Sequence, residues 1–249
     1  MDLGLDQKVA VVTGAAQGIG AAIAEELAAE GCSVALVDHA ANQIIDEAAG
    51  RVAARGVRSM VLKADVTDFD AAGLTLDKVA EELGALDILV CCAGITRDAV
   101  SWKMTEDEFD SVIDVNLKGV FNYNRAAALH FRKRGWGRIV NIASINGMRG
   151  KFGQANYAAS KGGVIALSKS MARELGKSSV TVNCVAPGLV MTEMAADIPA
   201  EFLDTARSET VTGRLAETED VAKVVTFLCS EAARHVTGEV IRVDGGQYI

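Results

Sequence analysis

Short runs of β-branched and other apolar residues alternate with alanine- and leucine-rich amphipathic segments along the chain. Runs that are apolar throughout are typical of strands buried on both faces, as in a parallel sheet covered by helices. The alternation predicts an α/β fold, a doubly wound (Rossmann) seven-stranded parallel sheet with helices on both faces. The expected strands are residues 8–13, 33–38, 57–65, 87–93, 138–144, 180–185 and 239–243. The expected helices include residues 21–30, 68–83, 106–134, 154–176 and 218–230.

The pattern indicates a single domain. Of the 249 residues, 50% are hydrophobic and 23% charged, which is enough apolar material for a large core. Because composition does not change along the chain, residues 1–249 are expected to form one unit. The longest irregular stretch, about residues 188–214, is predicted to be a functional lid, because connections of that length are uncommon in compact domains.

Charge and cysteine usage exclude several classes of protein. A net charge of −8 argues against general binding to nucleic acid or anionic membranes. The 5 cysteines form no C-x-x-C pair, which predicts buried thiols in a reducing compartment. The three histidines, His39, His130 and His235, are scattered, so no metal site is expected. Without a signal-like leader or a long uncharged apolar run, the sequence predicts a soluble cytoplasmic protein.

A glycine-rich segment, residues 13–20, follows the first expected strand and opens the first helix. Its glycines, Gly14, Gly18 and Gly20, let the backbone turn tightly and approach a pyrophosphate at the helix N-terminus. The spacing is G-x-x-x-G-x-G instead of the general G-x-G-x-x-G. A purely structural turn is the alternative, but the position between strand and helix favours a dinucleotide site.

Asp38 ends the second expected strand, where a carboxylate can accept hydrogen bonds from the adenosine ribose of NAD. With NADP it would face a phosphate, and two like charges about 4 Å apart repel by about 4 kcal/mol at an effective dielectric near 20. Of the neighbouring residues only His39 could offset this, and it is mostly neutral at pH 7. NAD is therefore the predicted cofactor, the alternative being that Asp38 merely caps a turn.

Tyr157 and Lys161 are four residues apart, so they share one face if the segment is helical. A nearby cation favours the phenolate, which would suit proton transfer to or from an alcohol. Alone, such a pair is more often an ordinary surface pair.

In sequence order these features resemble the short-chain dehydrogenase/reductase family over nearly the whole chain. The motifs that carry the resemblance are residues 13–20, Asp65-Val66, Cys91-Cys92-Ala93-Gly94, Asn116, Ser144, Tyr157-x-x-x-Lys161, Pro187-Gly188, Thr192 and Val243-Asp244-Gly245-Gly246. One departure is Cys91-Cys92, where the family usually has two asparagines. The backbone formed by Ala93 and Gly94 should keep its shape.

The resemblance implies hydride transfer between a nicotinamide and a carbinol carbon. It makes Tyr157 the catalytic acid/base, has Ser144 bind the substrate oxygen, and has Lys161 hold the nicotinamide ribose and lower the pKa of Tyr157. Asn116 would maintain a helix kink and a water that relays protons. Asp65 would contact the adenine amino group. The implied cofactor contacts are Gly14, Gln17, Gly18, Ile19, Gly20, Asp38, Asp65, Val66, Cys92, Ala93, Gly94, Tyr157, Lys161, Pro187, Gly188, Val190 and Thr192.

The substrate is expected to be a neutral hydrophobic or aromatic secondary alcohol, or the ketone derived from it. The predicted pocket is largely apolar: Ser144, Ile145, Met148, Phe152, Gln154, Leu189, Met191 and Met194, with Trp102 as a further candidate and Arg149 and Lys151 at the rim. Parts of the chain look much like 3-oxoacyl-(acyl-carrier-protein) reductases, and this activity is kept as the alternative. Asp38 argues against it, because those enzymes generally use NADPH. The basic residues Arg132, Lys133, Arg134 and Arg138 could dock a carrier protein or form a solvated helix end.

A non-catalytic NAD-binding sensor or scaffold could share this fold. It is a less favoured alternative, because the residues Asn116, Ser144, Tyr157 and Lys161 are all present.

The resemblance also implies assembly. The protein is expected to be a homotetramer of 222 symmetry. It would assemble through the helices at 106–134 and 154–176 and through the C-terminal strand. Small residues on the second of these helices would allow close approach: Ala155, Ala158, Ala159, Gly162, Gly163, Ala166 and Ser170.

Overall fold

A seven-stranded parallel sheet forms the centre of the computed structural model, which describes residues 3–40, 42–195 and 198–249. The strand order is β3-β2-β1-β4-β5-β6-β9, and all neighbours are parallel. The strands are β1 (Val9–Thr13), β2 (Ser33–Asp38), β3 (Ser59–Lys63), β4 (Ile88–Cys91), β5 (Gly137–Ile142), β6 (Val180–Pro187) and β9 (Val240–Val243). The predicted doubly wound fold is confirmed. The order reverses between β1 and β4, and ligands of such sheets bind in the crevice at that point.

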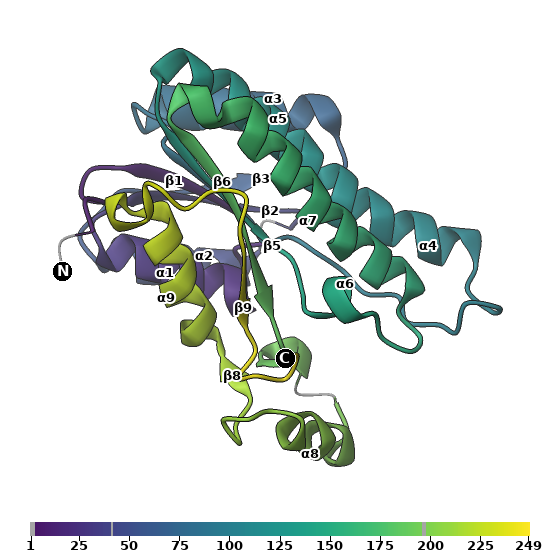
Figure 1. Ribbon diagram of the computed structural model, residues 1–249. Coiled ribbons are helices and arrows are strands. Elements are labelled where there is room, and N and C mark those ends of the chain that lie inside the picture. Colours follow the sequence, from purple (N-terminus) through teal and green to yellow (C-terminus); the bar gives the residue numbers. More distant parts are fainter. Residues whose placement is uncertain (1–2, 41, 196–197) are drawn as a thin grey trace.

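Helices cover both faces of the sheet (Figure 1). The first layer contains α1 (Gly18–Ala29), α2 (Gln43–Ala53) and α9 (Thr218–Cys229), and it packs Ile23, Leu27 and Val225 into one core cluster. The second layer contains α3 (Phe69–Glu82), α5 (Gly119–Arg134) and α7 (Ala155–Leu175), whose Leu76 and Phe131 belong to the other cluster. The sheet lies between two apolar layers, which is why its strands are apolar throughout.

The predicted helix at 106–134 is interrupted. It consists of α4 (Glu106–Ile113), a π-helical turn at Asp114–Lys118, and α5. The turn contains the fully buried Asn116, whose side chain bonds the loop after β4. Single π turns are rare and often mark functional positions.

The segment after β6 forms a small substructure beyond the carboxyl end of the sheet. It contains β7 (Val190–Met191), a short 3-10 turn (Glu193–Ala195), α8 (Ala200–Ser208) and β8 (Ala216–Glu217). β7 and β8 pair in parallel as a separate two-stranded sheet. Figure 1 shows α8 projecting away from the main sheet, and none of its residues is buried. This region coincides with the predicted lid at 188–214.

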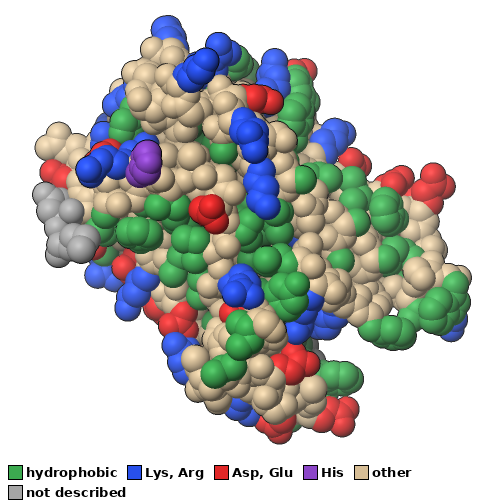
Figure 2. Space-filling view, in the orientation of Figure 1, with side chains coloured by type: hydrophobic (Ala, Val, Ile, Leu, Met, Phe, Trp, Pro, Cys, Tyr) green, Lys and Arg blue, Asp and Glu red, His purple; other side chains and the backbone are tan. Residues whose placement is uncertain are grey.

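Exposed apolar side chains gather at one end of the molecule. Figure 2 shows hydrophobic atoms at the end where, in Figure 1, the chain leads into α4. Trp102 and Phe152 lie near this end and are 75% and 82% exposed. Within the described ranges, no helix has the length and apolar character needed to cross a bilayer.

Candidate active site

A cavity of about 710 Å³ opens at the carboxyl ends of the central strands, at the crevice the topology creates. Every residue predicted to contact the cofactor lines it: Gly14, Gln17, Gly18, Ile19, Gly20, Asp38, Asp65, Val66, Cys92, Ala93, Gly94, Tyr157, Lys161, Pro187, Gly188, Val190 and Thr192. Of the candidate catalytic residues, Ser144 also lines the cavity, whereas Asn116 is buried and does not line it.

The glycine-rich turn admits no side chain at its key positions. Gly14 has a φ of +66°, and a Cβ there would lie 2.7 Å from the backbone of Ala93. At Gly20 a Cβ would lie 2.0 Å from the carbonyl oxygen of Gly14. The N-cap residue of α1, Gln17, makes no side-chain cap hydrogen bond. The first N–H groups of α1 are therefore left for an anion, and the residues present fit a dinucleotide pyrophosphate.

Two carboxylates lie at the far end of the cavity. Asp38 accepts hydrogen bonds from the backbone N–H of Ala16 (3.2 Å) and His39 (2.8 Å), and its Oδ1 lies 2.9 Å from the His39 ring. Asp65 accepts from the backbone N–H and the hydroxyl of Thr67, and these two bonds lower its pKa. Both side chains are thus fixed as hydrogen-bond acceptors.

Tyr157 and Lys161 lie one turn apart on α7, facing the cavity beside Ser144. The Lys161 ammonium donates a hydrogen bond to the carbonyl of Ile142 (2.7 Å) and lies 5.7 Å from the centroid of the Tyr157 ring. Burial raises the pKa of Tyr157 to about 12, although its hydrogen bond with Ser144 opposes this. Burial also lowers the pKa of Lys161. Burial therefore outweighs the groups that would lower the pKa of Tyr157, and the Lys161 ammonium, which was expected to lower it, is bonded to the Ile142 carbonyl.

Asn116 connects the π turn to the catalytic helix. Its Oδ1 accepts from the backbone N–H of Ile95 (2.8 Å), and its Nδ2 donates to the Ile95 carbonyl (2.9 Å) and to Ser160 Oγ (3.2 Å). A Cβ at Gly94 would lie 3.3 Å from Asn116 Oδ1 and 3.5 Å from Lys161 Nζ. Asn116 therefore fixes the loop that approaches Lys161, as expected of a residue at a helix distortion.

The departure at Cys91-Cys92 leaves the backbone anchored. Thr13 Oγ1 accepts hydrogen bonds from the N–H groups of Cys92 (3.2 Å) and Ala93 (3.3 Å). Asn124 Nδ2 lies 3.3 Å from the Cys91 sulfur. Burial raises the pKa of Cys92 to about 11, so this thiol is uncharged at neutral pH. In the described part of the chain, all 5 cysteines are free thiols and none belongs to a group that could hold a metal ion.

Comparisons with known proteins agree with this geometry. A family profile described as Enoyl-(Acyl carrier protein) reductase matches residues 14–247. The chain is 41% identical over 242 residues to the 3-oxoacyl-(acyl-carrier-protein) reductase FabG of Staphylococcus aureus (strain Mu50), covering 97% of this chain and 98% of the relative. It is 42% identical over 248 residues to the FabG protein of Thermotoga maritima, covering 98% and 99%. A solved structure from Sinorhizobium meliloti 1021, described as a short-chain alcohol dehydrogenase, aligns with a TM-score of 0.94 and 33% identity over 97% of this chain and 96% of that one.

This chain belongs to the short-chain dehydrogenase/reductase family. The predicted resemblance is confirmed. As a member of this family the protein is an oxidoreductase that uses a nicotinamide cofactor. The cavity described above has the lining that such a cofactor requires.

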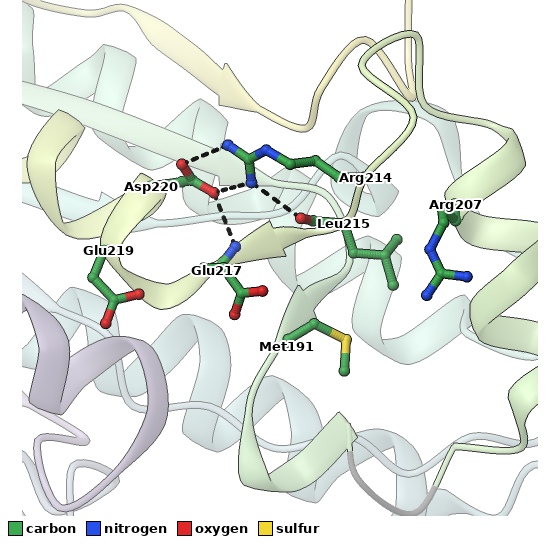
Figure 3. A pocket seen from close by; sticks show the side chains of 7 residues that line it. All are labelled: Met191, Arg207, Arg214, Leu215, Glu217, Glu219 and Asp220. Atoms are coloured by element: carbon green, nitrogen blue, oxygen red, sulfur yellow. Dashed lines mark hydrogen bonds and ion pairs between the residues drawn. The ribbon is translucent and has the colours of Figure 1, made fainter.

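The predicted substrate pocket of this dehydrogenase/reductase is only partly assembled around the cavity. Of its predicted residues whose side chains the structure describes, Ser144 alone lines it. Ile145 is 2% exposed and belongs to the core, whereas Phe152 is 82% exposed and Met148 is partly exposed. Met191 lines a second cavity, of about 600 Å³, together with Arg207 and Arg214 (Figure 3). Leu189 lies at the start of the lid, and the side chain of Met194 falls outside the described residues.

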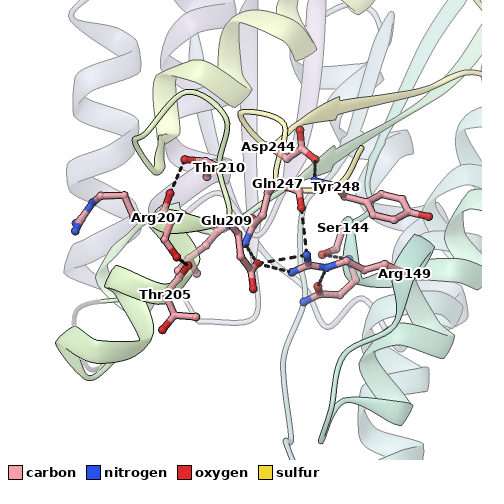
Figure 4. A network of polar contacts seen from close by, with 12 residues as sticks. Ser144, Arg149, Thr205, Arg207, Glu209, Thr210, Asp244, Gln247 and Tyr248 are labelled. Carbon is pink, nitrogen blue, oxygen red and sulfur yellow. Dashed lines mark hydrogen bonds and ion pairs between the residues drawn. The ribbon is translucent and has the colours of Figure 1, made fainter.

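Arg149, predicted at the rim, is held by the segment that was predicted to be a lid and by the C-terminal residues (Figure 4). Its guanidinium lies 3.4 Å from the carboxylate of Glu209, and it donates to the carbonyl of Gln247 (3.3 Å). Arg138 is not available for docking a carrier protein, because it is buried, stacks on Trp136 and pairs with Glu231 (3.0 Å). Arg134 pairs with Asp87 (2.9 Å).

Sequence reasoning missed the amides of Asn146 and Asn156 beside this site, and it placed Gln154 in the substrate pocket. Asn156 is fully buried and binds the backbone of both Arg97 and Glu108 at 2.8 Å. Gln154 joins Asn146 to Asp98 by two hydrogen bonds. The available signal was the density of amides between residues 146 and 156, but sequence alone does not show which of them point inward.

Proposed function

We propose that the protein is an NAD-dependent enzyme that transfers a hydride between a secondary alcohol and the corresponding ketone. The observation that carries this proposal is the placement of Ser144, Tyr157 and Lys161 together against a dinucleotide-sized cavity. A neutral, hydrophobic or aromatic substrate is supported by the charges of the cavity: among the described residues that line it, Lys161 is the only Lys or Arg.

Each residue has a role in the proposed reaction. The nicotinamide, when bound, supplies or accepts the hydride. Ser144 Oγ donates a hydrogen bond to the substrate oxygen. The Tyr157 hydroxyl gives its proton to that oxygen during ketone reduction and recovers it during alcohol oxidation. Lys161 contributes positive charge next to the phenol, and Asn116 holds the loop that packs against Lys161.

The raised pKa of Tyr157 affects which direction of the reaction is favoured at neutral pH. A group with a pKa of about 12 is protonated at neutral pH and is ready to donate. Ketone reduction therefore starts from the protonated phenol, which is the main form at pH 7. Alcohol oxidation requires the phenolate, which is scarce at that pH.

The preference for NAD rests on Asp38. Its carboxylate lines the cavity with 13% of the side chain exposed, and the adjacent His39 ring is 83% exposed. A 2′-phosphate beside Asp38 would be repelled, while ribose hydroxyls can donate to it. Steady-state kinetics with NADH and NADPH test this, and we expect a ratio of kcat/KM of roughly a hundredfold or more in favour of NADH.

Reduction of 3-oxoacyl thioesters is a second candidate, because the FabG proteins of S. aureus and T. maritima are similar to nearly the whole chain. Such a thioester is also a ketone, so the same residues would act on it. Two observations count against this reading: the carboxylate of Asp38, and the burial of Arg138 in the basic group that could dock a carrier protein.

One substrate panel separates the candidates. Aromatic and aliphatic ketones, their alcohols, and 3-oxobutanoyl thioesters of coenzyme A and of acyl-carrier protein are followed at 340 nm with each cofactor. Turnover confined to carrier-protein thioesters with NADPH would establish the second candidate. NADH binding without turnover of any substrate would instead favour a non-catalytic sensor.

A further inference from the structure

A chain of three side chains leads to the hydroxyl of Ser144. Asp98 Oδ2 accepts a hydrogen bond from Gln154 Nε2 (2.8 Å), and Gln154 Oε1 accepts one from Asn146 Nδ2 (3.0 Å). The backbone N–H of Asn146 in turn donates to Ser144 Oγ (3.1 Å). Gln154 is only 7% exposed, so both ends of its amide are satisfied inside the protein.

The last link fixes the direction of the Ser144 hydroxyl. A serine oxygen that accepts a hydrogen bond from a fixed donor keeps its own proton for another partner. In this site the other partners are the Tyr157 hydroxyl and the substrate oxygen. A shift of Asn146 would therefore release the serine rotamer that binds the substrate oxygen.

Asn146 cannot hold this position through helix formation alone. It begins α6 (Asn146–Arg149), a helix of only 4 residues, and so short a helix has little stability of its own. Gly147 packs against the backbone of Lys161, which seats the helix on α7. That contact leaves the orientation of the Asn146 side chain to its hydrogen bonds.

Two groups hold that side chain, and they differ in strength. Arg149 Nε donates to Asn146 Oδ1 at 3.3 Å, and Arg149 is tied to Glu209 by contacts of 3.4 Å at the surface. The bonds through Gln154 are shorter, less exposed and end on a carboxylate. Shorter bonds to an ionised acceptor are the stronger ones, and surface ion pairs contribute little.

We propose that Asp98 and Gln154 are positioning residues that hold Asn146 so that its N–H aligns Ser144 for the substrate oxygen. The proposal rests on the proposed function, in which Ser144 binds that oxygen. Asp98 fixes which end of the Gln154 amide faces Asn146, since only the Nε2 end can donate to a carboxylate.

A donor–acceptor exchange tests the proposal. Gln154→Glu places two carboxylates against each other, and the double variant D98N/Q154E restores one amide and one carboxylate with the wild-type net charge. D98N alone removes the charge at position 98 but keeps an oxygen that can accept from Gln154, so it separates the effect of the charge from that of the hydrogen bond. We expect kcat of Q154E to fall about tenfold or more, because small displacements of catalytic groups are costly. In the double variant, kcat should return to within about threefold of wild type. The kcat of D98N should lie between those of Q154E and the double variant, because an amide at position 98 can meet either end of the Gln154 amide. NADH affinity should stay at the wild-type value in all three, and Tm should fall only in Q154E, where two carboxylates face each other.

Equal kcat in Q154E and the double variant, with NADH affinity intact in both, would overturn the proposal. If Q154E does not fold, D98A replaces it: we expect a larger loss of kcat in D98A than in D98N, which keeps a polar partner for Gln154, and equal values in the two would also overturn the proposal.

Crystal structures of the variants give a readout that does not depend on turnover. The distance from Asn146 N to Ser144 Oγ, 3.1 Å in wild type, should exceed 3.5 Å in Q154E and recover in the double variant. An unchanged distance in Q154E would refute the positioning role. Wild-type protein that is inactive on the whole substrate panel would instead refute the proposed function, and the structures would still decide the positioning role.

Discussion

The Lys161 ammonium lies 5.7 Å from the centroid of the Tyr157 ring and donates its hydrogen bond to the Ile142 carbonyl, not to the phenol. Both groups are buried, and burial disfavours the charged form of each: it raises the pKa of Tyr157 and lowers that of Lys161. Burial therefore favours the protonated, uncharged form of the Tyr157 phenol beside Lys161. This arrangement leads directly to a prediction about pH.

Alcohol oxidation should accelerate with pH, whereas ketone reduction should not. The pKa of Tyr157 is raised to about 12, so the phenolate fraction grows about tenfold per pH unit between pH 7 and 9. The ionisable groups near the phenol are Lys161, Cys92 and Asp98, and burial keeps the Cys92 thiol neutral in this range. We expect log kcat/KM for oxidation to rise with a slope near one. A plateau below pH 8 would show that the pKa is lowered in the enzyme–NAD complex to which the alcohol binds.

Replacing Tyr157 by Phe should abolish turnover without abolishing cofactor binding, because it removes only the hydroxyl that transfers the proton. We expect kcat to fall by roughly a hundredfold or more. NADH affinity, measured by fluorescence titration, should change little. Tyr123→Phe is the matched control, since this tyrosine is also buried but points from α5 into the core. More than a tenth of wild-type turnover in Tyr157→Phe would reject the assignment.

The fold was predictable because parallel strands covered on both faces leave continuous apolar runs in the sequence. The strand Ser33–Asp38 is an example, since its observed bounds are those that were predicted. The π turn at Asp114–Lys118 was not, since its residues suit an ordinary helix. Its shape accompanies the bonds from Asn116 to Ile95, a contact that forms only in the folded chain.

Some features of the candidate site were also predictable from the sequence, and others were not. The cofactor residues were predictable because glycines and a strand-end carboxylate mark a turn whose geometry is local. The pKa of Tyr157 and the direction of Ile145 were not, because burial depends on distant segments. Asp98 and Gln154 meet across 56 positions of sequence, so their bond had no local signal.

Asp38→Ser should weaken the discrimination against NADPH. The substitution removes the charge facing a 2′-phosphate, and we expect kcat/KM for NADPH to rise by about tenfold or more while that for NADH falls. Glu193→Gln is the control, because it removes a carboxylate that also lines the cavity but lies near Gly18. Its effect should be similar for both cofactors. If both variants change the NADPH to NADH ratio equally, general charge and not Asp38 sets the preference.

Glycines in the two helical layers should differ sharply in their response to alanine. Gly50 in α2 and Gly73 in α3 have nothing within 4 Å of an added Cβ, so alanine should stabilise each by about 0.5–1 kcal/mol. At Gly147 the Cβ would lie 2.7 Å from the backbone of α7, and alanine should destabilise the fold and displace α6. Thermal unfolding of the three variants checks this. A higher Tm for Gly147→Ala would contradict the close packing.

The protein should assemble into a homotetramer of 222 symmetry. Phe109 and Phe121, on α4 and α5, are 40% and 43% exposed, and Ala159 and Ala166 are exposed on α7. Closed dihedral assemblies commonly bury such faces. Two of the small residues named for the interface, Gly162 and Gly163, instead pack against Gly147 and Leu117 of the same chain.

Light scattering at micromolar concentration measures the mass, and a value near the 26.1 kDa of one chain would refute assembly. Phe121→Glu should lower the mass, because it places a charge in the proposed interface. Phe202→Glu, on the exposed lid helix α8, is the control and should leave the mass unchanged. A stable dimer in the wild type would reject the 222 arrangement while keeping one of its interfaces.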